Sequence, residues 1–256
     1  MKNDLEYLLD FSLKLGEKMI VSGANLERVT DTIYRVCDSY GCQDIHFFSL
    51  SCYLSLNIKD ADGNRVSGQR CIRRGMNIRL DHLGQLNQLS RLVCSQTPSP
   101  EQLDRMLEDA VSAKGYSMPM LLFGSLLSSA CLTGIFDGSS HDLMIVLLNM
   151  ILLFFSGTYL RKLVLNKTVY NVLSAFLVGT IAILFDKIGF LDDFYTVMIV
   201  NSMKLIPGIP MVNAFRNLLT GNEINGALEL FKVILESIAI ACGFLMSIFL
   251  FYGGLS

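Results

Sequence analysis

The sequence lacks the residue clusters by which metal centres are usually recognised. Its seven cysteines are scattered and form no C-x-x-C pair, and His46, His82 and His141 stand far apart. A protein zinc site needs three or four Cys or His ligands at close spacing. We therefore expect no metal centre, and we interpret the cysteines as small apolar residues that pack in the interior.

The sequence also lacks the common motifs of enzymes. It contains no G-x-S-x-G, no P-loop, no dinucleotide fingerprint and no H-E-x-x-H. The net charge is −2 and there is no basic stripe, which argues against nucleic acid as a partner. The first residues, "MKNDLEYLLDFSLKLGEK", have no long apolar core, so we expect no secretory signal there. We expect neither an enzyme nor a cofactor.

What the sequence does have is an uneven excess of apolar residues. They make up 52% of the chain, and mean hydropathy is +0.46, above that of an ordinary soluble domain. Residues 1–117 hold 14 of the 21 Lys and Arg and 15 of the 23 Asp and Glu. This asymmetry predicts a polar domain over residues 1–115 and a transmembrane helical domain over residues 116–256. The patterns described next make the polar part a cytoplasmic α+β domain.

The polar part has patterns typical of a small α+β domain. Helices are predicted around residues 5–20 and 26–40, and again over 78–95 and 100–114. Between these pairs, residues 45–58 alternate with period two and predict one strand, with His46 on its apolar face as a core histidine. The turn "DADGN" and a returning strand over 65–74 follow. A calcium loop is the weaker interpretation of this turn, because its glycine and its twelfth residue do not fit that motif.

Five apolar segments follow Tyr116, each close to the ~20 residues that span a bilayer. Small residues recur in the first and third segments and favour close helix packing, within the chain or against a partner. The segments cover residues 117–136, 143–160, 168–185, 194–215 and 233–252.

The loops predict how these spans are oriented. The connection between spans two and three carries three cations and that between spans four and five is flanked by two, whereas loop 136–142 has none and loop 186–193 has one. The positive-inside rule then places the N-terminal domain in the cytoplasm and the C-terminus outside. The five cations are Arg161, Lys162, Lys167, Arg216 and Lys232.

The fourth span contains its own helix breakers. Pro207 and Pro210 each remove an amide hydrogen, and Gly208 lies between them, so the helix is predicted to break near mid-depth. Broken helices in membranes line cavities, and the start of the second half suits a carboxylate. Lys204 lies one turn before the break and would add a positive charge. The neutral hydrogen-bonding groups of the predicted site belong to Asn201, Ser202 and Asn213.

Simpler interpretations of these charged residues remain open. The prolines would then only kink a packed helix, with Lys204 snorkelling to the interface or paired with an acid on another span. Glu236 is the acid that could form this pair, or it could carry a proton, and Asp186 is a second candidate for proton coupling. His141, with Asp137 and Asp142, could bind a cation, although a solvated loop is the favoured interpretation.

Two motifs resemble the threonine/serine exporter family. "LGEKMIVSGANLERV" (15–29) resembles the family's N-terminal signature, and "LIPGIPMVNAFRNLLTGNEINGALEL" (205–230) is similar to its membrane signature. The resemblance extends over nearly the whole chain. Two departures stand out: Asn217 replaces the usual Asp, and Lys204 occupies an apolar position of the pattern. Both changes favour an anionic substrate.

The resemblance implies export of small polar metabolites across a bacterial inner membrane. The chain is similar to the larger half of split members, including the large subunits of two-component succinate exporters, which work with a smaller membrane subunit. We therefore expect an oligomeric secondary exporter of an amino acid or dicarboxylate, driven by an ion gradient, with Arg216 at an inner gate or steering the carboxylate. A channel is one alternative, and a membrane-anchored sensor or assembly factor without transport activity is another.

Overall fold

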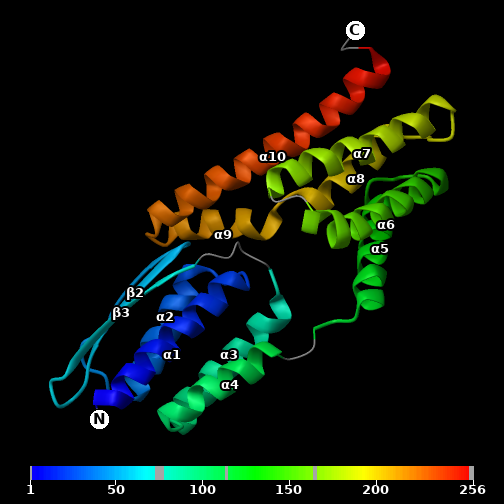
Figure 1. Ribbon diagram of the computed structural model, residues 1–256. Coiled ribbons are helices and arrows are strands. Elements are labelled where there is room, and N and C mark those ends of the chain that lie inside the picture. The colour runs from blue at the N-terminus through cyan, green and yellow to red at the C-terminus, as the bar shows by residue number, and fades with distance from the viewer. Residues whose placement is uncertain (1, 73–77, 113–114, 164–165, 254–256) are drawn as a thin grey trace. The chain divides into compact units, whose positions relative to one another are not determined.

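The computed structural model of the protein describes residues 2–72, 78–112, 115–163 and 166–253, and within them the side chains of all but residues 2, 3, 100 and 160–163 (Figure 1). Arg161 and Lys162, on which the predicted orientation partly rests, lie among the side chains not described. The ends of the strand predicted over 65–74 and of the helix predicted over 100–114 also lie outside the described residues.

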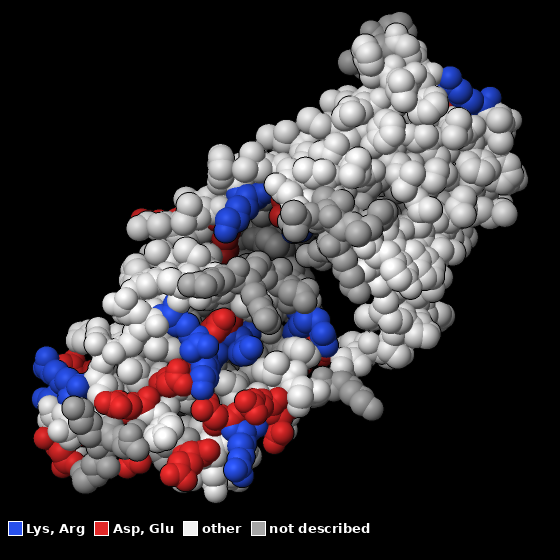
Figure 2. Space-filling view, in the orientation of Figure 1, with Lys and Arg blue, Asp and Glu red and all other residues white. Residues whose placement is uncertain are grey.

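The chain divides into two compact units. The first, here called the N-terminal unit, contains Met1–Gly115 together with Ile209–Glu229. The second, the membrane unit, contains Tyr116–Gly208 and Leu230–Ser256. The N-terminal unit thus takes in a segment that the sequence analysis placed in the membrane domain. Charged side chains gather over the N-terminal unit, and few are visible on the membrane unit (Figure 2).

The N-terminal unit has three layers. Helices α1 and α2 lie between a three-stranded antiparallel sheet and the helix pair α3–α4 (Figure 1). Helix α9 and the first turns of α10 (Glu223–Tyr252) complete the unit. Its elements are α1 (Lys2–Val21), α2 (Leu26–Ser39), β1 (His46–Leu50), β2 (Tyr53–Lys59), β3 (Arg65–Cys71), α3 (Leu80–Gln96), α4 (Pro100–Ser112) and α9 (Gly208–Leu219).

Helix α1 forms the centre of an apolar core because it is packed on several sides. Phe11, Leu15 and Met19 are at most 1% exposed. The sheet approaches α1 so closely that a Cβ at Gly68 of β3 would lie 2.9 Å from the Cδ1 of Leu13. Glycine at this position therefore allows strand and helix to pack in contact.

The single strand predicted over residues 45–58 is wrong, because these residues form a hairpin. A two-residue turn separates β1 from β2, and Phe47 pairs with Leu56. Directly paired residues point to the same face of a sheet. The inward positions of β1 are therefore the odd-numbered residues, such as Phe47, and not the even-numbered ones that a single strand would place there. Leu56 is fully buried, whereas His46 is exposed and contacts Asp44 at 2.9 Å. His46 is therefore not a core histidine.

The membrane unit is a bundle of long apolar helices. By length and composition, four helices of the described chain are able to cross a membrane: α5, α6, α7 and α10. The pair α8–α9 makes a fifth span if this broken pair is counted as one. Helix α10 begins ahead of the predicted residue 233, since a polar first part precedes the apolar run. The bounds are α5 (Met118–Ile135), α6 (Ser140–Leu163), α7 (Lys167–Lys187), α8 (Phe194–Leu205) and α10 (Glu223–Tyr252).

Two loops meet at one end of the membrane unit around Asp142. This side chain is fully buried, and its carboxylate accepts hydrogen bonds from the backbone amides of Ser139, Asp192 and Asp193 at 2.9–3.1 Å. His141 lies 3.2 Å from Asp192. The described residues contain no cluster of acids, cysteines and histidines suited to a metal ion. Asp142 therefore orders the α5–α6 and α7–α8 loops.

Helices α7 and α10 approach each other closely at two glycines. A Cβ at Gly243 would lie 2.4 Å from the carbonyl oxygen of Val172, and one at Gly179 would lie 2.3 Å from the hydroxyl of Ser247. Neither position has room for a larger side chain. This is the close backbone packing that small residues permit between membrane helices.

Candidate functional site

The predicted break in the fourth apolar segment is confirmed. Helix α8 ends at Leu205 and α9 begins at Gly208, with a bend of 63° between them. Ile206 has the extended backbone (ψ 129°) that a following proline favours, and Pro207 has no amide hydrogen to continue the helix. Pro210 lies in the first turn of α9, where a missing amide hydrogen is tolerated.

Two buried asparagines lie at a similar depth in the membrane unit. The loops before α6 and α8 meet at Asp142, so both helices start from the same end of the bundle. At 1.5 Å per residue, Asn149 lies about 13 Å along α6 and Asn201 about 10 Å along α8. Each follows, within about one helical turn, apolar residues that pack in one shared cluster: Ile145 and Val146 on α6, and Val197 and Val200 on α8.

These asparagines are buried without hydrogen-bond partners. Asn149 and Asn201 are each 0% exposed, and neither their Nδ2 nor their Oδ1 atoms have a partner among the described residues. Asn171 on α7 is 3% exposed and has an unpartnered Nδ2. A buried polar group without a partner costs about 1–3 kcal/mol. Asn149 and Asn201 thus leave four donor or acceptor atoms without partners at a similar depth.

A lysine lies one turn further along α8. Lys204 follows Asn201 by three residues, so the two lie near one face of the helix. Its Nζ donates to the hydroxyl of Ser125 on α5 at 3.1 Å. Ser125 is followed on the same face of α5 by Ser129, which is 1% exposed. We call Asn149, Asn201, Lys204, Ser125 and Ser129 the polar layer.

The remaining predicted residues of α8 and the break have other surroundings. The hydroxyl of Ser202 donates to the carbonyl oxygen of Ile199 at 2.7 Å, so its proton is already used. Pro207 is buried, whereas Gly208 is exposed and a Cβ there would meet nothing within 4 Å.

Asn213 and Arg216 lie in the N-terminal unit, where they contact the other family-like motif. The amide of Asn213 donates to the carbonyl oxygen of Gly23 at 3.3 Å, and the Nε of Arg216 lies 3.3 Å from the carboxylate of Glu27. The two quoted motifs, far apart in the sequence, therefore meet within one unit. The polar layer belongs to the other unit.

Asn217 also has a partner within the N-terminal unit. It is fully buried, and its Nδ2 donates to the carboxylate of Glu229 at 3.0 Å. Ser51, in the turn of the β1–β2 hairpin, donates to the same carboxylate at 3.2 Å and through its backbone amide to Asn225. Asn217 thus supplies a donor to a buried acid, which an ionised aspartate would not.

Each acidic candidate for proton coupling has a partner. Glu236 pairs with Lys167 at 2.8 Å, which argues against the alternative that it pairs with Lys204. Asp186 accepts a hydrogen bond from the hydroxyl of Tyr252. Both acids lie away from the polar layer, near opposite ends of α7.

The polar layer combines one cation with neutral donors and acceptors. The lysine suits a carboxylate, and the asparagine amides suit a second carboxylate, a hydroxyl or an ammonium group. Sequence reasoning predicted Asn201 and Lys204 but missed Asn149 and Asn171. Each missed residue is a lone amide within an apolar run, and that signal could have identified it.

Comparison of the sequence with known protein families finds one match. The family model of the threonine/serine exporters (ThrE) matches residues 10–251. No curated protein and no solved structure matches the chain.

Proposed function

The chain belongs to the threonine/serine exporter family, and on this premise we propose that it is the larger subunit of a secondary exporter that acts with a smaller membrane subunit. The family is one of multi-pass membrane transporters for small molecules, and the apolar helices agree with that class. The proposed cargo is threonine, serine or a dicarboxylate such as succinate, carried across the inner membrane.

The polar layer supports this proposal most directly. Asn149 and Asn201 are buried and have no partner among the described residues, while Lys204 is paired there with a hydroxyl rather than with an acid. The acids of the described membrane unit lie in or beside its loops, or, like Glu236, pair with another lysine. An anionic group of the cargo would supply the counter-charge that Lys204 lacks.

The other predicted residues enter this proposal in two groups. Pro207, Gly208 and Pro210 shape the break, while Asn201, Ser202, Lys204 and Asn213 contact the cargo at some stage of transport. Arg216 acts at an inner gate, because an exposed ion pair such as that with Glu27 is weak enough to open and close.

Exposure of α5 supports a partner subunit. Only 11% of the residues of α5 are buried within the chain, compared with 44% of the residues in the apolar stretch of α7. Lys204, which contacts α5, is itself exposed. A charge at mid-depth that faces lipid costs about 2.5–3.5 kcal/mol. A second polypeptide against α5 would remove that cost, and the small residues Gly124, Ser128 and Cys131 would let its helices approach closely.

We further propose that the N-terminal unit faces the cytoplasm, the C-terminus lies outside and protons drive export. Lys167 lies at the end of the membrane unit opposite Asp142, and the loops around Asp142 carry several acids and one lysine. This asymmetry agrees with the positive-inside rule. Glu236 and Asp186 are the proposed proton carriers.

The transport test uses Lys204→Met in vesicles that contain both subunits. Uptake of threonine and of succinate is measured side by side. We expect the variant to take up at least about tenfold less than the wild type, because the positive charge that binds the cargo is lost. Lys232→Met, on an exposed lysine of α10, is the matched control and should keep normal uptake. Unchanged uptake and binding of both compounds in Lys204→Met would refute the site. An absence of uptake even in the wild type with its partner would favour a sensor or assembly factor.

The partner test uses photo-crosslinking. Leu127 on α5 and Leu245 on α10 are equally exposed, at 53%. A photoreactive residue at 127 should capture a small membrane protein, whereas one at 245 should capture it far less. Equal capture from both positions, or capture from neither, would contradict the proposed place of the partner.

A further inference from the structure

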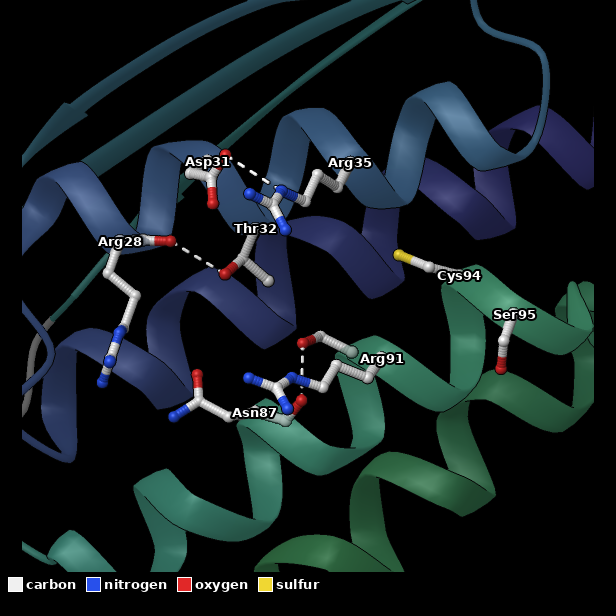
Figure 3. A pocket seen from close by; sticks show the side chains of 9 residues that line it. Arg28, Asp31, Thr32, Arg35, Asn87, Arg91, Cys94 and Ser95 are labelled. Atoms are coloured by element: carbon white, nitrogen blue, oxygen red, sulfur yellow. Dashed lines mark hydrogen bonds and ion pairs between the residues drawn. The ribbon is translucent and has the colours of Figure 1, made fainter.

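The N-terminal unit contains a cleft of about 580 Å³ between α2 and α3. Its walls are polar, and all of its lining residues belong to these two helices (Figure 3). Arg28, Thr32 and Arg35 recur at helical spacing along α2, and Asn87 and Arg91 do so along α3. The cleft is therefore a feature of one unit and is separate from the polar layer.

Positive charge dominates this cleft. Three arginines line it against one acid, Asp31, which pairs with Arg35 at 3.0 Å. Arg28 and Arg91 have no ion-pair partner among the described residues. Figure 3 shows Arg28 extending from α2 toward the side of the cleft where Asn87 and Arg91 lie on α3. Two guanidinium groups are thus free to bind an anion between the helices.

The hydroxyl groups in the cleft wall already donate hydrogen bonds within their own helices. Thr32 and Ser90 are each 8% exposed and donate to backbone carbonyls of their own helices, those of Arg28 and Asn87 respectively, at 2.8 Å. The Asn87 amide and the two arginines remain as donors toward the cleft. Guanidinium groups bind carboxylate and phosphate in a two-pronged geometry, so this donor set selects oxyanions.

The lining residues also limit the chemical class of the ligand. None of the nine residues around the cleft is aromatic, so there is no face on which a nucleobase would stack. We propose that the cleft binds a small dianion without an aromatic group, either a dicarboxylate or a phosphate. Arg28 and Arg91 bind its two negative charges, Asn87 donates to one of its oxygens, and Arg35 stays paired with Asp31.

Isothermal titration calorimetry on the purified full chain tests this site. The probes are succinate, inorganic phosphate and, as a zwitterion, threonine, each at constant ionic strength. All titrations use the Lys204→Met background, so that the polar layer does not contribute a carboxylate signal. We expect saturable binding of succinate or phosphate, which identifies the class of dianion, and much weaker binding of threonine.

Matched variants separate the cleft from general surface charge. Arg28→Gln and Arg91→Gln should each weaken binding about tenfold or more, the effect of losing one charge-assisted hydrogen-bonding group. Arg91→Lys should restore part of it. Arg105→Gln removes an exposed arginine of α4 outside the cleft and should leave binding unchanged.

Three results would overturn the proposal. The first is that neither succinate nor phosphate binds, and the second is that threonine binds as tightly as these two dianions. The third is that Arg105→Gln weakens dianion binding as much as Arg91→Gln does. The melting temperature of each variant, measured without ligand, confirms that it folds. None of these outcomes depends on transport, so the cleft and the proposed function stand or fall separately.

Discussion

The two units of this protein differ in the size of their apolar cores and in the side chains that they expose. The N-terminal unit has one apolar core around Phe11, Leu15 and Met19, and its exterior is charged. The membrane unit has a much smaller apolar cluster, exposes large apolar side chains and encloses Asn149 and Asn201 without partners among the described residues.

This difference follows from the solvent of each unit. In water, burying apolar side chains is the main favourable term, so the first unit needs a continuous core. In a bilayer, lipid solvates apolar side chains as well as a protein interior does, so the bundle is held by close packing, as at Gly243. Its interior is then free to hold polar groups for a ligand. The variants below test this contrast, beginning with the largest expected effect.

Phe11→Ala should destabilise the N-terminal unit by about 3–5 kcal/mol, because it leaves a cavity in the core. Cys37 is a natural probe, since it is fully buried. Its neighbour Cys42 and burial both raise the pKa of the Cys37 thiol, so it should react only when the unit opens. Maleimide labelling of Cys37 is followed by mass spectrometry at increasing urea concentrations. In Phe11→Ala the labelling should begin at a lower urea concentration than in the wild type. Phe48→Ala, at a 56% exposed residue of β1, should shift it little.

Asn217→Asp should destabilise the N-terminal unit by about 3 kcal/mol at neutral pH. It replaces a donor to the buried Glu229 carboxylate with a second carboxylate. The same labelling assay measures this loss of stability. The loss should become smaller at lower pH, because one of the two carboxyl groups then takes up a proton. Asn166→Asp, at the exposed first residue before α7, adds the same charge where aspartate caps equally well. Equal effects of the two substitutions would contradict the contact with Glu229.

Gly243→Ala should destabilise the membrane unit by about 1–3 kcal/mol through overpacking. Its methyl group would lie 2.4 Å from the carbonyl oxygen of Val172. The melting temperature of the protein in detergent reports the change. Gly134→Ala on α5 is the control, because nothing lies within 4 Å of its Cβ position. If both variants melt alike, close packing of α7 against α10 does not hold the bundle together.

Local patterns predicted much of this fold. Apolar runs located the membrane helices, and Pro207 located the break. The hairpin at residues 51–52 was missed because alternation continues through a turn that has neither glycine nor asparagine. The contacts of Asn213 with Gly23 and of Arg216 with Glu27 join distant residues, and no local pattern encodes such pairs. Asn201 and Lys204 were predicted as site residues because they precede a helix break, whereas Asn149 lies within an uninterrupted helix.

The central claim is that the buried asparagines are kept for a ligand and not for folding. The direct measurement compares Asn201→Leu with the wild type for both uptake and melting temperature, in vesicles that contain the complete exporter. Leucine has a similar size and leaves no unpartnered polar atom, so the melting temperature should stay the same or rise, while uptake falls by at least about tenfold. Uptake at the wild-type rate, or a clearly lower melting temperature, would contradict the account.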